Sequence, residues 1–192
     1  PFLAAARDRG LAVQRAPKPK LTQIAGDSSH QGVVLEAGPY RYGEVAEMLA
    51  LASEREEKPF LLLLDLLHGP QNIGALLRTA ELCGVHGVIT QDRRAPDITP
   101  TVVTHSVGAV EHLLVAQVTN LVETMRALKE QGVWLVGMDI GEEAVTLSAV
   151  DLDMPLGIVV GHEGEGLRRL VRDTCDFLLR LPMRGHVDSF NA

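Results

Sequence analysis

Polar side chains that could bind a ligand or stabilise developing charge are gathered in three short segments of the 192-residue chain. The first covers residues 65–80, where an apolar run is followed by Asn72, Gly74 and Arg78 in a helical pattern. Ligands of open α/β folds bind at the carboxyl ends of the strands, where this segment would lie. A guanidinium held on the helix could reach a phosphate or a developing oxyanion. Taken singly, however, Asn72 is more often a helix cap, Gly74 a close-packing residue and Arg78 an ion-pair partner.

The second segment, residues 156–167, has the order strand, glycine turn and helix. It differs from the dinucleotide-binding fingerprint, because Glu163 stands where a glycine would approach a pyrophosphate and Glu165 follows it. Two carboxylates would repel a diphosphate, but they are compatible with a ligand that lacks phosphate and carries a positive sulfonium, such as S-adenosylmethionine. Alternatively, they complement the positive end of a helix dipole.

The third segment, residues 181–192, follows a predicted strand. Ser189 and Asn191 offer a hydroxyl and an amide at alternate positions, which could orient a substrate oxygen or a cofactor carboxylate. Alone, this pattern is also that of an ordinary loop.

Apolar runs that alternate with amphipathic segments predict the elements that would position these residues. The predicted strands cover residues 60–65, 87–90, 112–116, 133–139, 156–160 and 177–181. The predicted helices between them cover residues 72–83, 121–131 and 166–174. Because the strands are continuously apolar, we expect an α/β fold with a mostly parallel sheet and helices on both faces.

The first 58 residues predict a different organisation. Residues 1–20 predict a broken helix and a short strand that lead into an extended stretch at residues 17–20, since proline removes backbone donors and favours extended backbone. A turn and a strand are expected over residues 29–36, and a charged helix over residues 44–57. The expected organisation is a remnant of an N-terminal domain over residues 1–35, a linker over residues 36–58 and the main domain over residues 59–192.

Charge is distributed unevenly along the chain. The formal net charge is −7 at pH 7, which argues against a protein that coats nucleic acid by bulk electrostatics. Residues 1–20 nevertheless hold five basic residues against Asp8 alone, a local charge of +4. This basic arm could contact nucleic acid or be an ordinary solvated surface. Its basic residues are Arg7, Arg9, Arg15, Lys18 and Lys20.

Membrane and metal functions are disfavoured. The longest apolar run, residues 60–64, is far shorter than the roughly 20 residues that span a bilayer, and no signal sequence opens the chain. Cys83 and Cys175 lie 92 residues apart and belong to no repeated pattern of Cys and His pairs, so neither a zinc site nor a disulfide framework is expected. These features fit a reducing cytoplasm.

Together and in this order, the three segments resemble the motif set of the SpoU/TrmH group of SPOUT methyltransferases. The family's Asn-x-Gly-x-x-x-Arg run matches residues 72–78, its Gly-x-Glu-x-x-Gly-Leu turn matches residues 161–167, and its Ile-Pro-Met…Ser-Leu-Asn ending matches residues 181–191. Runs at residues 29–34 and 104–112 further resemble the branch that modifies a guanosine ribose in 23S ribosomal RNA.

The resemblance implies an S-adenosylmethionine-dependent RNA 2′-O-methyltransferase with a C-terminal trefoil knot, an exception to the rule that chains avoid threading loops. It also implies a homodimer that binds RNA, either ribosomal RNA or transfer RNA, and it gives no role to a metal. The cofactor-binding residues that it implies are Gly137, Gly161, Leu181, Met183 and Phe190. The residues that it places around the reacting groups are Arg78, Asn72, Glu163, Ser189 and Asn191.

The sequence departs from the family pattern at three points. Phe190 replaces the usual leucine, and Gly69 replaces the aspartate that usually precedes Pro70. The sequence also stops at Ala192, before the helix that usually follows the third motif and helps to close the knot and the dimer contact.

Two other functions remain open at this point. A catalytically silent RNA-binding scaffold of the same fold would have no need of Arg78, Glu163, Ser189 and Asn191. A nicotinamide-dependent oxidoreductase would have to accommodate the two glutamates of the glycine turn. Binding of S-adenosylmethionine would argue against the scaffold, and binding of NAD in its place would favour the oxidoreductase.

Overall fold

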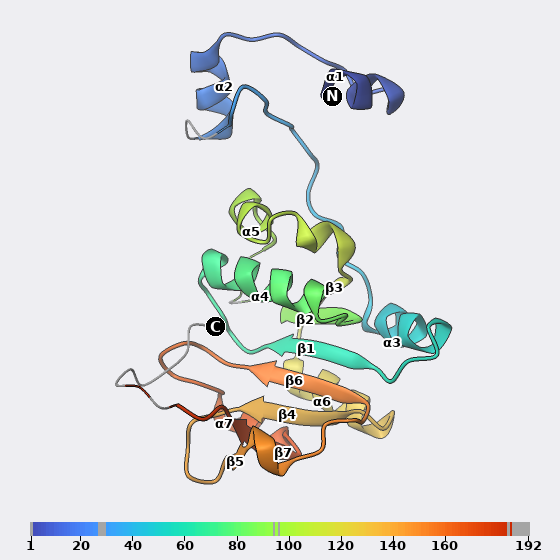
Figure 1. The fold of residues 1–192 in the computed structure, drawn as a ribbon, viewed down its shortest axis with the longest axis vertical. Coiled ribbons are helices and arrows are strands. Elements are labelled where there is room, and N and C mark those ends of the chain that lie inside the picture. Colours follow the sequence, from blue (N-terminus) through green and yellow to red (C-terminus); the bar gives the residue numbers. More distant parts are fainter. Residues whose placement is uncertain (1, 27–29, 94, 96, 184, 186–192) are drawn as a thin grey trace. The chain divides into compact units, whose positions relative to one another are not determined.

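The computed structural model describes residues 2–26, 30–93, 95, 97–183 and 185, and the chain divides into two compact units, residues 1–39 and 40–192. The first unit contains α1 (Phe2–Asp8) and α2 (Lys18–Ala25) (Figure 1). The extended stretch predicted at residues 17–20 is wrong, because Pro17 is the N-cap of α2 and proline is tolerated in the first helical turn. The strand predicted after the turn is also wrong, since residues 33–36 form no ladder with any described strand.

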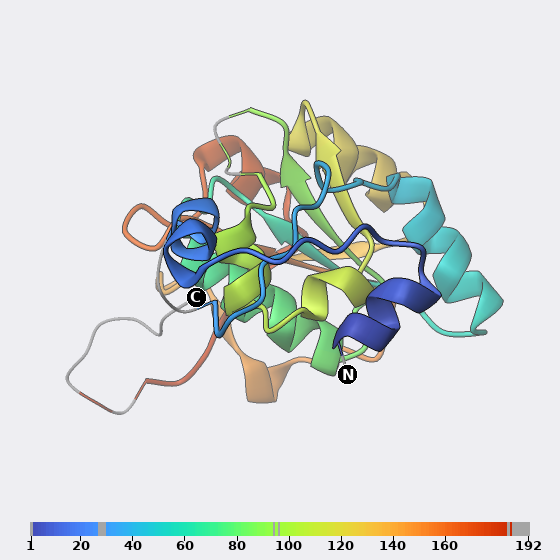
Figure 2. The same cartoon turned by 90° about the horizontal axis from the view of Figure 1, so that it is seen from above.

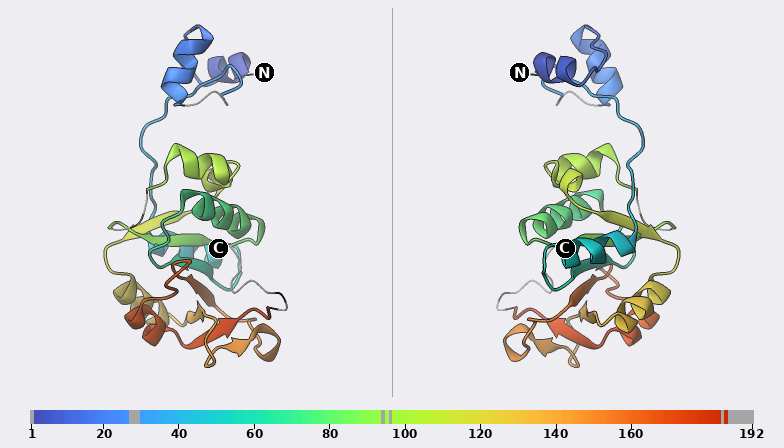
Figure 3. Two further views of the ribbon diagram at one scale, coloured as in Figure 1. Left: turned by 90° about the vertical axis from the view of Figure 1, so that its left-hand side faces the viewer. Right: turned by 90° about the vertical axis from the view of Figure 1, so that its right-hand side faces the viewer.

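The second unit is built on one sheet, which confirms the predicted α/β class with a mostly parallel sheet. Within the described residues seven strands follow the order β3-β2-β1-β6-β4-β7-β5, and every neighbouring pair is parallel. Strands β1–β3 form one half of the sheet along the strand order, and strands β4–β7 form the other half (Figure 3). The strands are β1 (Phe60–Leu64), β2 (Gly87–Gln91), β3 (Val115–Val118), β4 (Trp134–Met138), β5 (Val145–Thr146), β6 (Leu156–Val160) and β7 (Phe177–Arg180).

Helices cover both faces of the sheet (Figures 1 and 2), as the continuously apolar strands predicted. Strand β1 shows why, since alternate side chains of a strand point to opposite faces. Leu61 and Leu63 pack with α3 (Val45–Glu54), α6 (Leu121–Glu130) and α7 (Arg169–Thr174). Leu62 and Leu64 pack with α4 (Pro70–Leu82), α5 (Pro100–His105) and the 3-10 helix η1 (Ala109–His112). A second 3-10 helix, η2, covers Leu147–Ala149.

Three local differences from the predicted elements have physical causes. Strand β3 begins at Val115 rather than at residue 112, because the left-handed Gly108 turns the chain into η1 first. Helix α7 begins at Arg169, since residues 166–168 complete a loop. The helix predicted over residues 44–57 is present as α3 but ends at Glu54, because Glu56 has a positive φ of 55° that a helix does not continue; its Met48 and Ala52 are fully buried in the second unit.

No helix among the described residues is long and apolar enough to cross a membrane.

Candidate functional site

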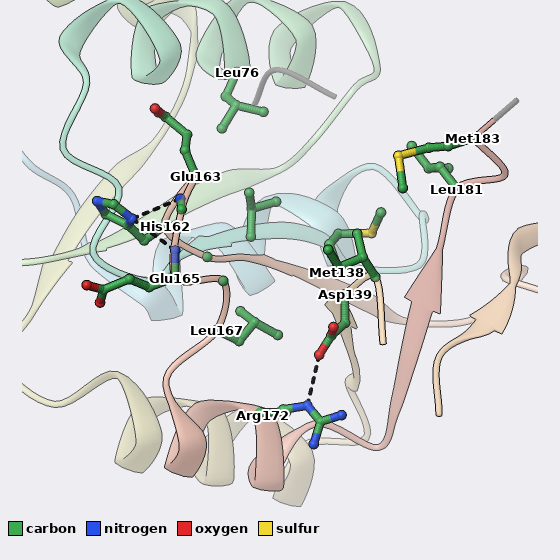
Figure 4. Close-up of a pocket in the computed structure, with 15 residues that line it drawn as sticks. Leu76, Met138, Asp139, His162, Glu163, Glu165, Leu167, Arg172, Leu181 and Met183 are labelled. Carbon is green, nitrogen blue, oxygen red and sulfur yellow. Dashed lines mark hydrogen bonds and ion pairs between the residues drawn. The ribbon is translucent and has the colours of Figure 1, made fainter. Parts of the chain in front are cut away.

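A cavity of about 620 Å³ lies beside the carboxyl ends of β4, β6 and β7 (Figure 4). Parallel strands bring these ends to one edge of the sheet, which is the edge where the sequence predicted a ligand. Residues 138–140 begin with the last residue of β4, residues 160–167 begin with the last residue of β6, and Leu181 and Met183 follow β7. Leu76 of α4 and Arg172 of α7 complete the lining.

The glycine loop, residues 161–167, contributes every one of its residues to the cavity wall. It closes on itself, because His162 N donates to Gly166 O at 3.0 Å and Gly166 N donates to His162 O at 2.8 Å. The ring nitrogen Nδ1 of His162 accepts hydrogen bonds from the backbone of Gly164 and Glu165. A Cβ on Gly161 would lie 2.4 Å from the Gly166 carbonyl, so this close approach requires glycine.

Helix α4 and the glycine loop meet through two predicted residues. Asn72, in the first turn of α4, donates a hydrogen bond from its side-chain amide to the Glu163 carboxylate. The capping role considered for Asn72 is not observed, because Gly69 is the N-cap residue and no side chain caps this helix. The first and second motifs therefore form one wall beside the cavity.

Arg78 does not line the cavity. It is exposed on α4, and it has no hydrogen bond or ion pair with any residue that the structure describes. A helix turns by roughly 100° per residue, so the side chain six residues after Asn72 points roughly 120° away from it around the helix axis. Gly74, one turn before Arg78, packs closely on α5, since a Cβ there would lie 2.5 Å from His105 Cβ. Arg78 thus belongs to the surface of α4 beyond the cavity.

The remaining predicted residues divide into three groups. Leu181 and Met183 line the cavity. Gly137 lies behind the wall, where a Cβ would come within 2.7 Å of Leu167 Cδ1, so it gives room for a lining side chain. Ser189, Phe190 and Asn191 lie outside the described residues.

Two charged residues of the cavity were not predicted from the sequence. Asp139 follows β4 and accepts a hydrogen bond of 2.8 Å from Arg172 Nε, while a terminal nitrogen of Arg172 lies 3.0 Å from Glu143 (Figure 4 shows the first contact). Partial burial acts to raise the pKa of the Asp139 carboxyl, but hydrogen bonds from Arg172, Gly141 and Ile140 outweigh it and hold the pKa below its usual range. A carboxylate at the carboxyl end of a predicted strand, residues 133–139, was the available signal in the sequence.

The charged side chains give the described lining a negative character. The lining residues include three carboxylates, from Asp139, Glu163 and Glu165, and one guanidinium, from Arg172. His68 packs edge-on against His162 beside this wall, with 5.7 Å between ring centroids. In the described part of the chain no cluster of His, Cys, Asp or Glu could hold a metal ion. The excess of negative charge suits a cationic organic ligand.

Comparison with known proteins identifies the family. Residues 59–192 match the family described as SpoU rRNA Methylase, and residues 1–43 match a domain described as RNA 2′-O ribose methyltransferase substrate binding. The chain belongs to the SpoU/TrmH methyltransferase family.

Curated relatives agree with this assignment. The chain is 44% identical over 187 residues to YacO of Bacillus subtilis, which is described as a TrmH family tRNA/rRNA methyltransferase, and this match covers 97% of the chain and 74% of YacO. It is 42% identical over 191 residues to a Staphylococcus saprophyticus protein of the same description, covering 100% of the chain and 76% of that protein.

Solved structures show the same fold. The SpoU methyltransferase AviRb from Streptomyces viridochromogenes, solved in complex with the cofactor AdoMet, matches with a TM-score of 0.63 and 30% identity over 70% of this chain. The present chain spans about half of AviRb, 52% of its length. An AdoMet-bound rRNA methyltransferase from Sinorhizobium meliloti has a TM-score of 0.75 over 98% of this chain and 70% of that one, and its 22% identity supports the fold alone.

Proposed function

We propose that this protein is an S-adenosylmethionine-dependent RNA methyltransferase that methylates a ribose 2′-hydroxyl. The observation that carries the proposal is the cavity formed by the glycine loop in a chain of the SpoU/TrmH family. Glycine at position 161 allows the loop to close on its own backbone at Gly166 and so to line the cavity, and the three carboxylates favour a sulfonium over a diphosphate. AviRb, a relative by fold and sequence, has been solved with this cofactor.

The roles of the residues follow from where they lie. The cofactor supplies an electrophilic methyl group on a positively charged sulfur. The loop backbone and the apolar side chains of Leu167, Leu181 and Met183 would enclose it, and the Asn72–Glu163 hydrogen bond would fix the wall nearest the helix. We propose that Ser189, Phe190 and Asn191 complete the site, as the family motif implies.

Arg78 is proposed to stabilise the ribose oxygen as it loses its proton, and to grip an adjacent phosphate. A guanidinium has donors only and keeps its proton, so it is an electrostatic stabiliser rather than a base. Because Arg78 lies on the α4 surface outside its own cavity, a second copy of the chain would have to bring its α4 to that cavity, or the RNA would have to reach around the helix. The proposed homodimer favours the first arrangement.

A trefoil knot and a guanosine of 23S ribosomal RNA are further parts of the proposal. The resemblance of residues 29–34 and 104–112 supports the ribosomal branch, whereas the description of YacO includes transfer RNA as well. Mapping 2′-O-methylation in both RNA classes, from cells with and without the protein, decides between them. A site that disappears only from transfer RNA would overturn the ribosomal assignment.

The cofactor is tested by calorimetric titration of the full chain with S-adenosylmethionine and, separately, with NAD. We expect saturable binding of the first and none of the second. RNA binding without S-adenosylmethionine binding would indicate a catalytically silent scaffold, and binding of NAD alone would indicate an oxidoreductase.

The basic arm is proposed to contribute RNA affinity rather than chemistry. All five of its basic side chains are exposed, and residues 1–43 match a substrate-binding domain. Neutralising them together should weaken RNA binding and flatten its salt dependence, by about 0.7–0.9 in the log–log slope for each phosphate that the arm neutralises in the native chain. The turnover of bound RNA should stay the same. An unchanged slope would assign the phosphate contacts elsewhere, first to Arg93, Arg94, Arg168 and Arg169.

A further inference from the structure

The buried carboxylate of Asp65 lies directly after β1, at the same edge of the sheet as the cavity. Its side chain is 0% exposed, and its backbone N–H donates to Val160 O at 2.8 Å, next to the start of the glycine loop. A buried charge is costly unless it is paired and hydrogen-bonded. Asp65 is paired with one residue, Arg168, in two ways.

Arg168 directly follows the glycine loop and is the N-cap residue of α7. Its backbone N–H donates to Asp65 Oδ2 at 2.8 Å, and its side-chain Nε donates to Asp65 Oδ1 at 2.7 Å. One carboxylate therefore fixes both the main chain and the side chain at the exit of the loop. Neither residue lines the cavity itself.

The same guanidinium reaches a third strand. A terminal nitrogen of Arg168 donates to Gln91 Oε1 at 2.9 Å, at the carboxyl end of β2. Gln91 is 5% exposed, and its amide nitrogen has no hydrogen-bond partner among the described residues. A buried amide that leaves its donor unpaired has its orientation set by its acceptor, here by the contact with Arg168. Arg168 thus ties the ends of β1 and β2 to the loop that follows β6.

We propose that Asp65 and Arg168 are positioning residues that hold the glycine loop in the shape and place needed to bind the cofactor; this inference rests on the proposed function. The hydrogen bonds between His162 and Gly166 close the loop on itself but do not fix it to the sheet. Two contacts with the first motif do so: the Asn72–Glu163 hydrogen bond at the cavity and the Asp65–Arg168 pair at the loop exit. The second is the more buried, so it is the stronger constraint.

A contribution to stability alone would not require these residues. A buried ion pair often stabilises a fold no more than apolar side chains of similar volume would, whereas removal of one partner leaves an uncompensated charge. Stability and positioning can therefore be separated by comparing a single variant with a neutral double variant.

The variants are Arg168→Met, Asp65→Asn and the double variant. In the double variant the amide oxygen introduced at position 65 can still accept the backbone N–H of residue 168, and no buried charge is left unpaired. Arg169→Met is the matched control, because Arg169 is the next residue, its side chain is 92% exposed and its ion pair with Asp173 is 3.7 Å long. Each full-length chain is examined by thermal unfolding, by calorimetric titration with S-adenosylmethionine and by amide hydrogen exchange without cofactor.

We expect Arg168→Met to lose both thermal stability and cofactor affinity. The double variant should recover most of the stability but bind S-adenosylmethionine about tenfold more weakly than the native chain. A tenfold change in affinity has the size of a typical interaction energy between two residues in contact. Amides of residues 161–168 should exchange faster in both variants, and in the double variant, which recovers most of the stability, those of β1 and β2 should exchange nearly as in the native chain. The control should match the native chain in all three measurements.

Native affinity and native loop exchange in a stable double variant would overturn the positioning role and leave the proposed function intact. Failure of the native chain to bind S-adenosylmethionine would overturn the proposed function. In that case the hydrogen-exchange measurement would still report whether the Asp65–Arg168 pair fixes the loop, but the pair would have no role in cofactor binding.

Discussion

The spacing of residues singled out both helix α4 and the glycine loop in the sequence. The two elements differ in whether those residues point to one place. The loop closes through backbone hydrogen bonds, so all of residues 161–167 face one cavity. In α4 the helical turn separates Asn72, which contacts the loop, from Arg78, which lies on another face. A sequence motif thus predicts convergence in a closed loop, whereas in a helix the angle between positions has to be considered first.

Substitution of Gly161 tests the loop side of this comparison and should have the largest effect. Gly161→Val places a Cβ 2.4 Å from the Gly166 carbonyl, which is backbone and cannot move aside without opening the loop. We expect S-adenosylmethionine affinity to fall by more than about 100-fold, the scale of a displacement of roughly 1 Å in a binding site. Calorimetric titration of the folded variant measures it.

Gly164→Ala is the matched control within the same loop. A Cβ there would meet nothing closer than His162 Nδ1 at 3.8 Å, an ordinary contact. Affinity should remain within about twofold of native, the scale of a neutral surface substitution. Equal losses in the two variants would mean that the loop tolerates no change at all, and equal retention would place the cofactor elsewhere.

Substitution of Arg78 tests the helix side. Arg78→Ala should lower the single-turnover methylation rate about 10²–10³-fold, as the loss of one preorganised donor does, with cofactor affinity unchanged because Arg78 lies outside the cavity. The methylation rate of Arg78→Lys should lie between those of the native chain and Arg78→Ala, since lysine keeps the charge but lacks the planar guanidinium with its paired donors. Arg126→Ala, at an exposed arginine of α6, is the control and should match native. Near-native turnover of Arg78→Ala removes this residue from the reaction.

A mixture of Arg78→Ala and Gly161→Val chains separates the two arrangements left open for Arg78. If the α4 of one copy serves the cavity of another, mixed dimers contain one site with both an intact loop and an arginine, and activity returns. If each chain uses its own arginine, the mixture stays inactive.

The sheet and most of its helices could be predicted because long apolar runs report burial directly. Strand β5 could not, since its two residues carry no periodic signal and it forms only by pairing with β7. Helix α5 was missed because β-branched Val102 and Val103 disfavour helices, while Thr99 as cap and Pro100 at the first position stabilise this one.

The candidate site was predictable where one segment makes it and not where distant segments meet. Gly161, Glu163, Leu181 and Met183, which the motifs single out, line one cavity, and their roles in binding and catalysis stay predictions. The pairing of Asp139 with Arg172 depends on α7 lying beside the end of β4, and no local pattern states that arrangement. The same holds for Arg168 and Asp65, which are 103 residues apart in the chain.

Substitution of the Asp139–Arg172 pair should have the smallest effect of these variants. It tests a part of the cavity wall that side chains hold together, in contrast to the glycine loop, which backbone hydrogen bonds close. Because hydrogen bonding outweighs burial and lowers the pKa of Asp139 in the folded chain, the folded state binds its proton less readily than the unfolded state. The contribution of the ionised Asp139 carboxylate to the free energy of unfolding is therefore complete above its unfolded pKa of about 3.9. It is lost as the pH falls through the lower pKa of the folded state. Asp139→Asn should lower the melting temperature by up to about 3 °C at pH 6, the scale of one partly exposed ion pair, and by progressively less as the pH falls below about 3.9.

The variant Arg172→Met tests whether the Arg172 guanidinium is what lowers the pKa of Asp139. Among the causes that lower this pKa, the hydrogen bond from Arg172 is the largest, with the backbone of Gly141 and Ile140 contributing less. In the Arg172→Met background the effect of Asp139→Asn between pH 2 and 6 should therefore shrink, though not vanish, because those backbone donors remain. An undiminished pH dependence would assign the lowered pKa to the turn after β4 alone. The cavity wall would then be fixed by local backbone there, as it is in the glycine loop, and the contrast between the two kinds of wall would disappear.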